Sequence, residues 1–169
     1  MNLKGKRIII KKFTKSMAKD VHLNSLDDDV RKYLPDEVFE DIEEAKETIE
    51  YLISRYSSDS GPFVYPILLK TKENIGYVQL NYLNDDWEIG FCIAKKYRNQ
   101  GYASEAVQLF LPTIMKEKHI EDIEGICLKE NVASRRVLEK CKFELVYEGR
   151  GDYQGTRQEI CVYKYENGR

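Results

Sequence analysis

A short stretch at positions 97–106, YRNQGYASEA, places an arginine, a glycine and an alanine in the spacing R-x-x-G-x-A before a helix pattern. The start of a helix leaves backbone N–H groups unpaired and carries partial positive charge, so it suits a phosphate. Gly101 has no Cβ, and Ala103 is small, so a phosphate oxygen can approach the backbone there. Arg98 adds a permanent positive charge. The spacing favours a phosphate loop, but alone it also fits an ordinary turn with an exposed arginine.

The segments around this loop must hold it at a helix start. A strand pattern ends at Ile93, and the helix after the loop carries apolar residues on one face. Those residues are Ala103, Ala106, Val107, Phe110, Ile114 and Met115. Pro112 lies inside the pattern and removes a backbone donor, so we expect a kink or a new turn there. Neither a GxxxxGK[ST] nor a GxGxxG pattern occurs, which excludes the common nucleotide loops.

The remaining chain alternates between strand and helix patterns, with no linker or repeat. Strands are expected at 7–13, 64–69, 75–83, 87–93, 123–128, 144–150 and 158–165, and further helices at 16–33, 40–56 and 132–141. The acidic run 27–29 interrupts the first helix, residues 84–86 read as a hairpin turn, and residues 151–155 as a loop. This order predicts a single α/β (α+β) domain over residues 1–169, with a mixed sheet and helices on both faces.

Composition narrows the class of protein. The chain has 169 residues and a net charge of −2, without the basic excess usual for nucleic-acid binders. No apolar run is long enough for a membrane span or a signal-peptide core, so we expect a cytoplasmic protein without nucleic-acid or membrane partners. The four cysteines form no CxxC pair and read as buried reduced thiols, and the two histidines show no metal-ligand spacing.

A second motif follows the loop by about 30 residues: ENVASRRVLEKCKF, at 130–143. Together with WEIGFCI at 87–93 and YRNQGYASEAV at 97–107, it resembles the GNAT (Gcn5-related) N-acetyltransferases, near the ribosomal-protein N-terminal acetyltransferases. The likeness covers about residues 7–165. It implies a mostly antiparallel central sheet of about seven strands, with acetyl-CoA (coenzyme A) as co-substrate.

The resemblance also assigns residues. In the family, R/Q-x-x-G-x-G/A holds the pyrophosphate of acetyl-CoA, which maps onto Arg98, Gly101 and Ala103. The loop backbone would come from Asn99, Gln100, Tyr102 and Ser104. Asn131 and Ser134 would face the pantetheine arm, and Phe91, Cys92 and Ile93 would offer free backbone groups where their strand separates from its neighbour. One cation of the stripe Arg135, Arg136 and Lys140 could meet the 3′-phosphate, although a solvated helix face is equally compatible.

Two departures from the family pattern bear on the turn and the mechanism. Lys142 stands where the family usually has a glycine after the helix, so we expect a left-handed lysine there at modest cost. Leu138 stands where many members carry the tyrosine that protonates the leaving thiolate. That role is therefore vacant or filled by another residue.

The implied reaction is direct attack of a primary amine on a thioester, which needs a base and benefits from an acid. Glu88 is the candidate base and Ser134 the candidate thiolate acid, with Tyr147 and Tyr153 as weaker alternatives. Each could instead be a solvated or ligand-contacting side chain. The acidic residues within 27–44 could attract a cationic acceptor.

The expected acceptor is a small-molecule amine or a peptide or protein N-terminus, and the expected assembly a monomer or homodimer. A non-catalytic acetyl-CoA-binding sensor or interaction module is the alternative, because a fold does not determine a function.

Overall fold

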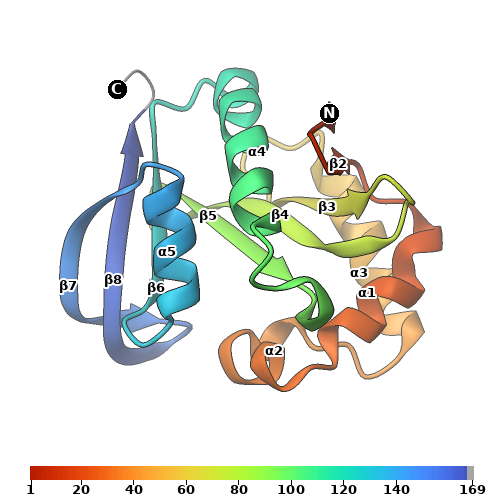
Figure 1. Cartoon of the computed structure of the whole chain (residues 1–169), viewed down its shortest axis with the longest axis horizontal. Helices are drawn as coiled ribbons and strands as arrows, with labels where there is room; N and C mark the ends of the chain where they lie inside the picture. Colours follow the sequence, from red (N-terminus) through yellow and green to blue (C-terminus); the bar gives the residue numbers. More distant parts are fainter. Residues whose placement is uncertain (167–169) are drawn as a thin grey trace.

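The strand patterns pair into one sheet in the computed structural model, which describes residues 1–166 (Figure 1). The sheet has eight strands in the order β1-β2-β3-β4-β5-β6-β8-β7, and every neighbouring pair except β5–β6 is antiparallel. The strands are β1 (Asn2–Lys4), β2 (Ile8–Lys11), β3 (Phe63–Leu69), β4 (Asn74–Leu83), β5 (Asp86–Ile93), β6 (Asp122–Leu128), β7 (Glu144–Tyr153) and β8 (Thr156–Glu166). The mixed, mostly antiparallel sheet is confirmed.

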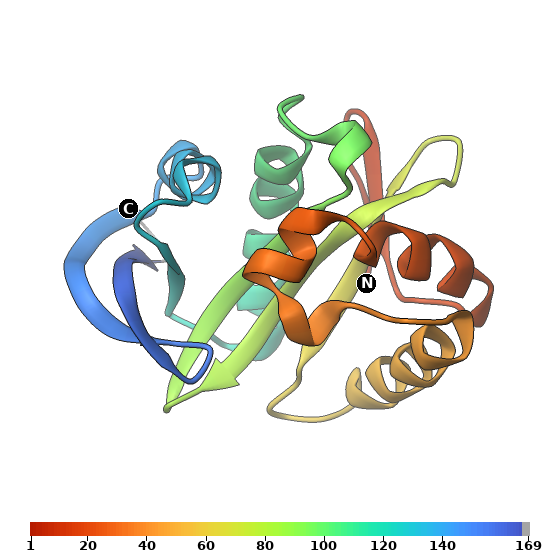
Figure 2. The same cartoon turned by 90° about the horizontal axis from the view of Figure 1, so that it is seen from below.

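Helices cover both faces of this sheet, as Figure 2 shows. The described residues form α1 (Ala18–Ser25), α2 (Asp28–Tyr33), α3 (Ile42–Arg55), α4 (Tyr102–Lys118) and α5 (Val132–Lys140), with 3-10 turns η1 (Lys15–Met17), η2 (Pro35–Glu37) and η3 (Lys95–Tyr97). The larger core packs α4 and α5 on one face, around residues such as Phe110 and Leu138. A smaller cluster, including Ile49 and Val64, joins the other face to the layer of α1 and α3.

The acidic run interrupts the first helical segment for a local reason. Asp27 is the N-cap of α2, and its side chain accepts hydrogen bonds from the backbone N–H groups of Asp29 and Val30. The N–H groups in the first turn of a helix have no carbonyl partner within that helix, and the side chain of an N-cap aspartate accepts from them. The predicted break at 27–29 is therefore confirmed, and the stretch 16–33 is two short helices rather than one.

The sheet opens between β5 and β6. These strands are parallel and share a single register pair, Glu88 beside Glu124, after which they diverge (Figure 1). By contrast, β4 and β5 pair along their whole length through a hairpin whose turn residues, Asn84 and Asp85, have φ of 51° and 68°. Positive φ at both positions is typical of a type I′ turn, so the predicted hairpin is confirmed.

Several expectations need correction. The sheet has eight strands instead of about seven, because the three-residue edge strand β1 pairs with β2. Strands β7 and β8 extend through the expected loop 151–155, so that only Gln154 and Gly155 turn. Pro112 lies inside α4 without ending it.

Other expectations agree with the structure. Lys142 adopts a left-handed φ of 67°, and all four cysteines are free thiols.

Candidate active site

The helix after the R-x-x-G-x-A motif begins with an uncapped end. Gly101 is the N-cap of α4, with φ 81° and ψ 7°, and no side chain accepts from the first turn. A Cβ at this position would lie 3.4 Å from Arg7 Nη2 and 3.9 Å from Lys140 Nζ. A cavity of about 440 Å³ opens here, lined in part by Lys6 and Gln108. Free helix donors between cations form an anion site.

Arg7 supplies much of the charge at this helix start, and the sequence motif did not identify it. Its guanidinium donates to Glu105 Oε2 over 2.7 Å and to the Gln100 carbonyl over 2.8 Å, and it stacks on the Tyr102 ring at 4.3 Å. Burial acts to raise the pKa of Glu105, but its hydrogen bonds from Arg7 outweigh that effect and lower it. Arg7 is therefore held in place beside the loop. The only sequence signal was the basic run 4–7 before the first long strand.

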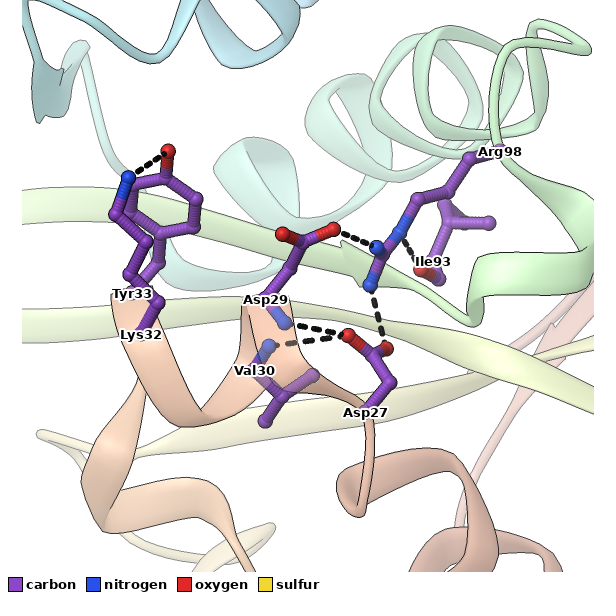
Figure 3. Close-up of polar contacts among 7 residues, drawn as sticks. All are labelled: Asp27, Asp29, Val30, Lys32, Tyr33, Ile93 and Arg98. Atoms are coloured by element: carbon purple, nitrogen blue, oxygen red, sulfur yellow. Dashed lines mark hydrogen bonds and ion pairs between the residues drawn. The ribbon is translucent and has the colours of Figure 1, made fainter.

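Arg98, by contrast, directs its guanidinium at Asp27, Asp29 and the Ile93 carbonyl, as Figure 3 shows. Its guanidinium donates to Asp27 Oδ2 over 2.6 Å, to Asp29 Oδ2 over 2.5 Å and to the Ile93 carbonyl over 2.8 Å. The side chain is 25% exposed, so these carboxylates satisfy most of its charge. Arg98 therefore joins the end of β5 to the start of α2 instead of adding its charge to the rim of the loop.

The other predicted loop residues shape the backbone. Asn99 has a φ of 58°, the Gln100 side chain donates back to the Lys96 carbonyl, and Ser104 is buried. Tyr102 and Ala103 begin α4 and pack on the larger core. Their contribution to the site is thus the geometry of the loop and the direction of its N–H groups.

The edge of β5 that faces the opening carries unpaired backbone groups. The Cys92 carbonyl points toward Gly76 of β4, since a Cβ there would lie 2.0 Å from it. Backbone groups of successive strand residues alternate between the two edges, so those of Phe91 and Ile93 face β6, which has already diverged. The Ile93 carbonyl accepts from Arg98. Phe91 and the Ile93 N–H thus face the opening, whereas the Cys92 backbone does not.

The start of α5 lies on the far side of this opening. Asn131 caps the helix through Oδ1, which accepts from the Ser134 N–H over 3.1 Å. This leaves the Asn131 amide group and the half-buried Ser134 hydroxyl as polar groups of the first turn. Leu138 is 2% exposed and packs on Gly125 of β6, where a Cβ would lie 2.6 Å from Leu138 Cδ2. It is a core residue, and the tyrosine role stays vacant at that position.

Glu88, the candidate base, lies beside Glu124 of the neighbouring strand β6. Burial and the neighbouring Glu124 raise its pKa to about 7. Burial, and then the charges of Glu88, Cys127 and Glu37, raise the pKa of Tyr153 to about 12, which places Tyr153 near Glu88. Tyr147 is exposed and donates to the Arg150 carbonyl. Of the two weaker tyrosine candidates, Tyr153 is thus the one on which the charge of Glu88 acts.

A second carboxyl group lies on the same face of the sheet. Burial, and then the charge of Asp36, raise the pKa of Glu37 to about 7. The side chain of Gln79 on β4 acts in the opposite direction and lowers the pKa of Glu37, but burial outweighs it. Four of the other eight acids of the 27–44 run are in ion pairs: Asp27 and Asp29 with Arg98, Glu40 with Arg31, and Glu43 with Lys46. The general acidity of the run did not single out Glu37, since its burial depends on the distant strand β4.

Among residues 1–166, no group of three or more His, Cys, Asp or Glu side chains could hold a metal ion. Nor does any helix in that range combine the length and apolar character needed to cross a bilayer.

Comparison with known proteins shows which family the chain resembles. Residues 7–144 match the acetyltransferase (GNAT) domain. The chain is 32% identical over 143 residues to the uncharacterized N-acetyltransferase YnaD of Bacillus subtilis (strain 168), covering 83% of this chain and 81% of that protein. It is 27% identical to a GNAT-family acetyltransferase from Bacillus anthracis, with a TM-score of 0.83 over 98% of both chains.

A further structure shares the fold at 18% identity and a TM-score of 0.82, over 98% of each chain: RimL, a ribosomal L7/L12 α-N-protein acetyltransferase, in complex with coenzyme A. The domain match covers most of the chain and agrees with the uncapped helix start and the open strand edge. The chain therefore belongs to the GNAT family of N-acetyltransferases and is an acyltransferase.

Proposed function

We propose that the protein transfers an acetyl group from acetyl-CoA to a primary amine by direct attack. The observation that carries this proposal is the uncapped start of α4, with Gly101 between Arg7 and Lys140, next to the open edge of β5. A phosphate-bearing chain bound at the helix start can run along that edge. Its pyrophosphate would be held by the first-turn N–H groups and by the cations Lys6, Arg7 and Lys140.

Bound there, acetyl-CoA would supply an activated acyl thioester. The residues of this chain then orient it and move protons. The backbone N–H groups of Phe91 and Ile93 are donors for the pantetheine amides and the acyl oxygen. Asn131 and Ser134 border the arm on the α5 side, and the Ser134 hydroxyl is our candidate to donate a proton to the departing sulfur.

Glu88 would take the proton from the incoming ammonium, directly or through a water molecule. A base whose pKa is near the working pH combines a useful deprotonated fraction with adequate basicity. A non-catalytic acetyl-CoA-binding module would need no such carboxyl beside the open strand edge. The candidate acceptors are a small amine and a protein N-terminus.

The test is thiol release from acetyl-CoA against polyamines, amino alcohols, amino acids and short peptides with free N-termini. Acetyl-CoA binding is measured in parallel by calorimetry. We expect release that depends on one amine class and is absent in Gly101→Glu, which places a carboxylate between the phosphate-binding groups. If Gly101→Glu is folded and still binds acetyl-CoA as tightly as the wild type, the assignment of the helix start is wrong.

A further inference from the structure

A second cavity lies on the opposite face of the sheet from α4. It has a volume of about 330 Å³ and is bounded by β3, β4 and β5 below and by α1 and α3 above. Its walls are mainly apolar, formed by Phe13, Val21, Phe39, Ile49, Leu52 and Val64. Cavities of about 300 Å³ or more with apolar walls and a few polar groups are the usual form of small-molecule sites.

One buried polar group in this wall has no partner. Asn74 is 4% exposed, and its Nδ2 makes no hydrogen bond with any residue in 1–166. The orientation of the amide is determined, because Oδ1 accepts from the Gly76 N–H over 2.9 Å and a flip would set two donors against each other. A buried amide donor without a partner costs roughly 1–3 kcal/mol. A ligand atom that accepts this hydrogen bond would recover that cost.

The cavity also includes an acidic group. Glu37 lines it together with Cys92 of β5, whose pKa is raised to about 12 by burial and then by the charge of Glu37. Side chains of alternate strand residues lie on the same face of a sheet, so Glu88 lies on the same side of β5 as Cys92, which lines the cavity. A carboxylate here suits an ammonium group that must also approach the open edge of β5.

We propose that this cavity is the acceptor pocket and takes a small primary amine on an apolar body that also carries a hydrogen-bond acceptor. The amino group meets Glu37, the apolar body fills the space below α1 and α3, and a hydroxyl or carbonyl oxygen accepts from Asn74. The proposal rests on the proposed acetyl transfer and names its substrate class.

Two other amine classes fit this space less well. A polyamine or an aminoglycoside would bring several further charged groups against mainly apolar walls, where burial of a charge is costly, and Asp36 is one further acid of the lining that could pair with them. A peptide would have to continue past its first residue, whereas the volume is near the lower limit for small-molecule sites. The chemistry of the walls therefore favours a compact amine.

The experiment uses leucinol and phenylalaninol as probes. Phenethylamine, which lacks the hydroxyl, is compared with phenylalaninol, and spermidine and seryl and alanyl peptides represent the other classes. We expect kcat/KM for the two amino alcohols to exceed that for spermidine and the peptides by at least about 10-fold. Phenethylamine should be about 5- to 30-fold worse than phenylalaninol, as expected for one hydrogen bond to a buried group. Preference for the polyamine or a peptide would overturn the proposal.

Variants locate the probe within the protein. Val21→Phe on α1 should fill the cavity and raise the KM for leucinol more than 10-fold, with acetyl-CoA affinity unchanged. Leu23→Phe is the matched control, because Leu23 lies on the same helix and is 55% exposed. Glu37→Gln should raise the KM for both amino alcohols by about 10- to 100-fold. If Val21→Phe does not fold, Thr48→Leu on α3 makes the same test from the other wall.

Binding measurements distinguish a failure of the proposed acetyl transfer from a failure of the pocket assignment. If the protein fails to bind acetyl-CoA, the proposed acetyl transfer fails. If acetyl-CoA binds and this binding depends on Gly101, but leucinol neither reacts nor binds in calorimetry with coenzyme A present, only the pocket assignment fails. Binding of leucinol that Val21→Phe does not weaken overturns the pocket in the same way.

Discussion

Arg98→Gln tests whether this arginine is a structural connection or a phosphate ligand. The guanidinium makes three hydrogen bonds in the structure, two of them to carboxylates (Figure 3). Asp29 is 57% exposed, so its pair contributes at most about 1 kcal/mol. Asp27 is 14% exposed, and loss of its cation leaves a mostly buried carboxylate, a change that costs about 3–5 kcal/mol when the charge has no other partner.

Asp27 keeps two backbone donors, from Asp29 and Val30, which offset part of that cost. We therefore expect Arg98→Gln to lower the free energy of unfolding by about 2–3 kcal/mol. For a chain of this size that corresponds to a fall in Tm of roughly 5–10 °C. Arg98→Lys should recover only part of it, because a point charge cannot replace three donors in a planar fork.

The functional effect should fall on the acceptor side. Asp27 caps α2, and Val30 of that helix lines the acceptor cavity. Calorimetry should therefore show near-normal acetyl-CoA affinity for Arg98→Gln, with a raised KM for the amine. Arg31→Gln, which breaks the exposed pair with Glu40, is the control and should change stability by less than about 0.5 kcal/mol. The reasoning is refuted if Arg98→Gln melts like the wild type while binding acetyl-CoA more than 10-fold less tightly.

Three further predictions concern the loop, the base and the end of α5. Arg7→Gln should weaken acetyl-CoA binding at least 10-fold by calorimetry, because it removes the cation held beside Gly101; unchanged affinity would leave Lys6 and Lys140 as the phosphate cations. Glu88→Gln should lower kcat about 100-fold and abolish the rise in rate with pH up to about 7, since the base acts only when deprotonated. A persistent rise with normal kcat would exclude Glu88. Lys142→Gly should raise the free energy of unfolding by about 1 kcal/mol in thermal melts, by relieving a φ of 67°; a fall would mean that Lys142 makes a compensating contact.

The sequence predicted a feature of the fold correctly where that feature depends on neighbouring residues. Asp27 caps its helix by accepting from the backbone N–H groups two and three residues later, and the Asn84–Asp85 turn follows from residues that tolerate positive φ. The end of α5 likewise follows a local rule, with Lys142 in place of glycine and the Phe143 N–H donating to the Leu138 carbonyl over 3.0 Å. The edge strand β1 was not predicted, because three residues are too few to show an alternating pattern and its strand conformation depends on pairing with β2.

The side-chain roles in the site depend instead on contacts between distant parts of the chain. Arg98 fits the family motif, yet its partners lie 69 and 71 residues earlier, at the start of α2. Arg7, outside every motif, reaches the loop from the other end of the chain and bonds to Glu105, 98 residues away. A motif can specify that a helix must begin at Gly101, because that depends on backbone geometry. It does not determine which cation faces the phosphate, since that choice depends on which carboxylates the fold places nearby. For Arg98 those carboxylates are Asp27 and Asp29, so its charge stabilises the start of α2, a helix that contributes to the wall of the acceptor cavity. Arg7 is then the arginine that lies beside the helix start.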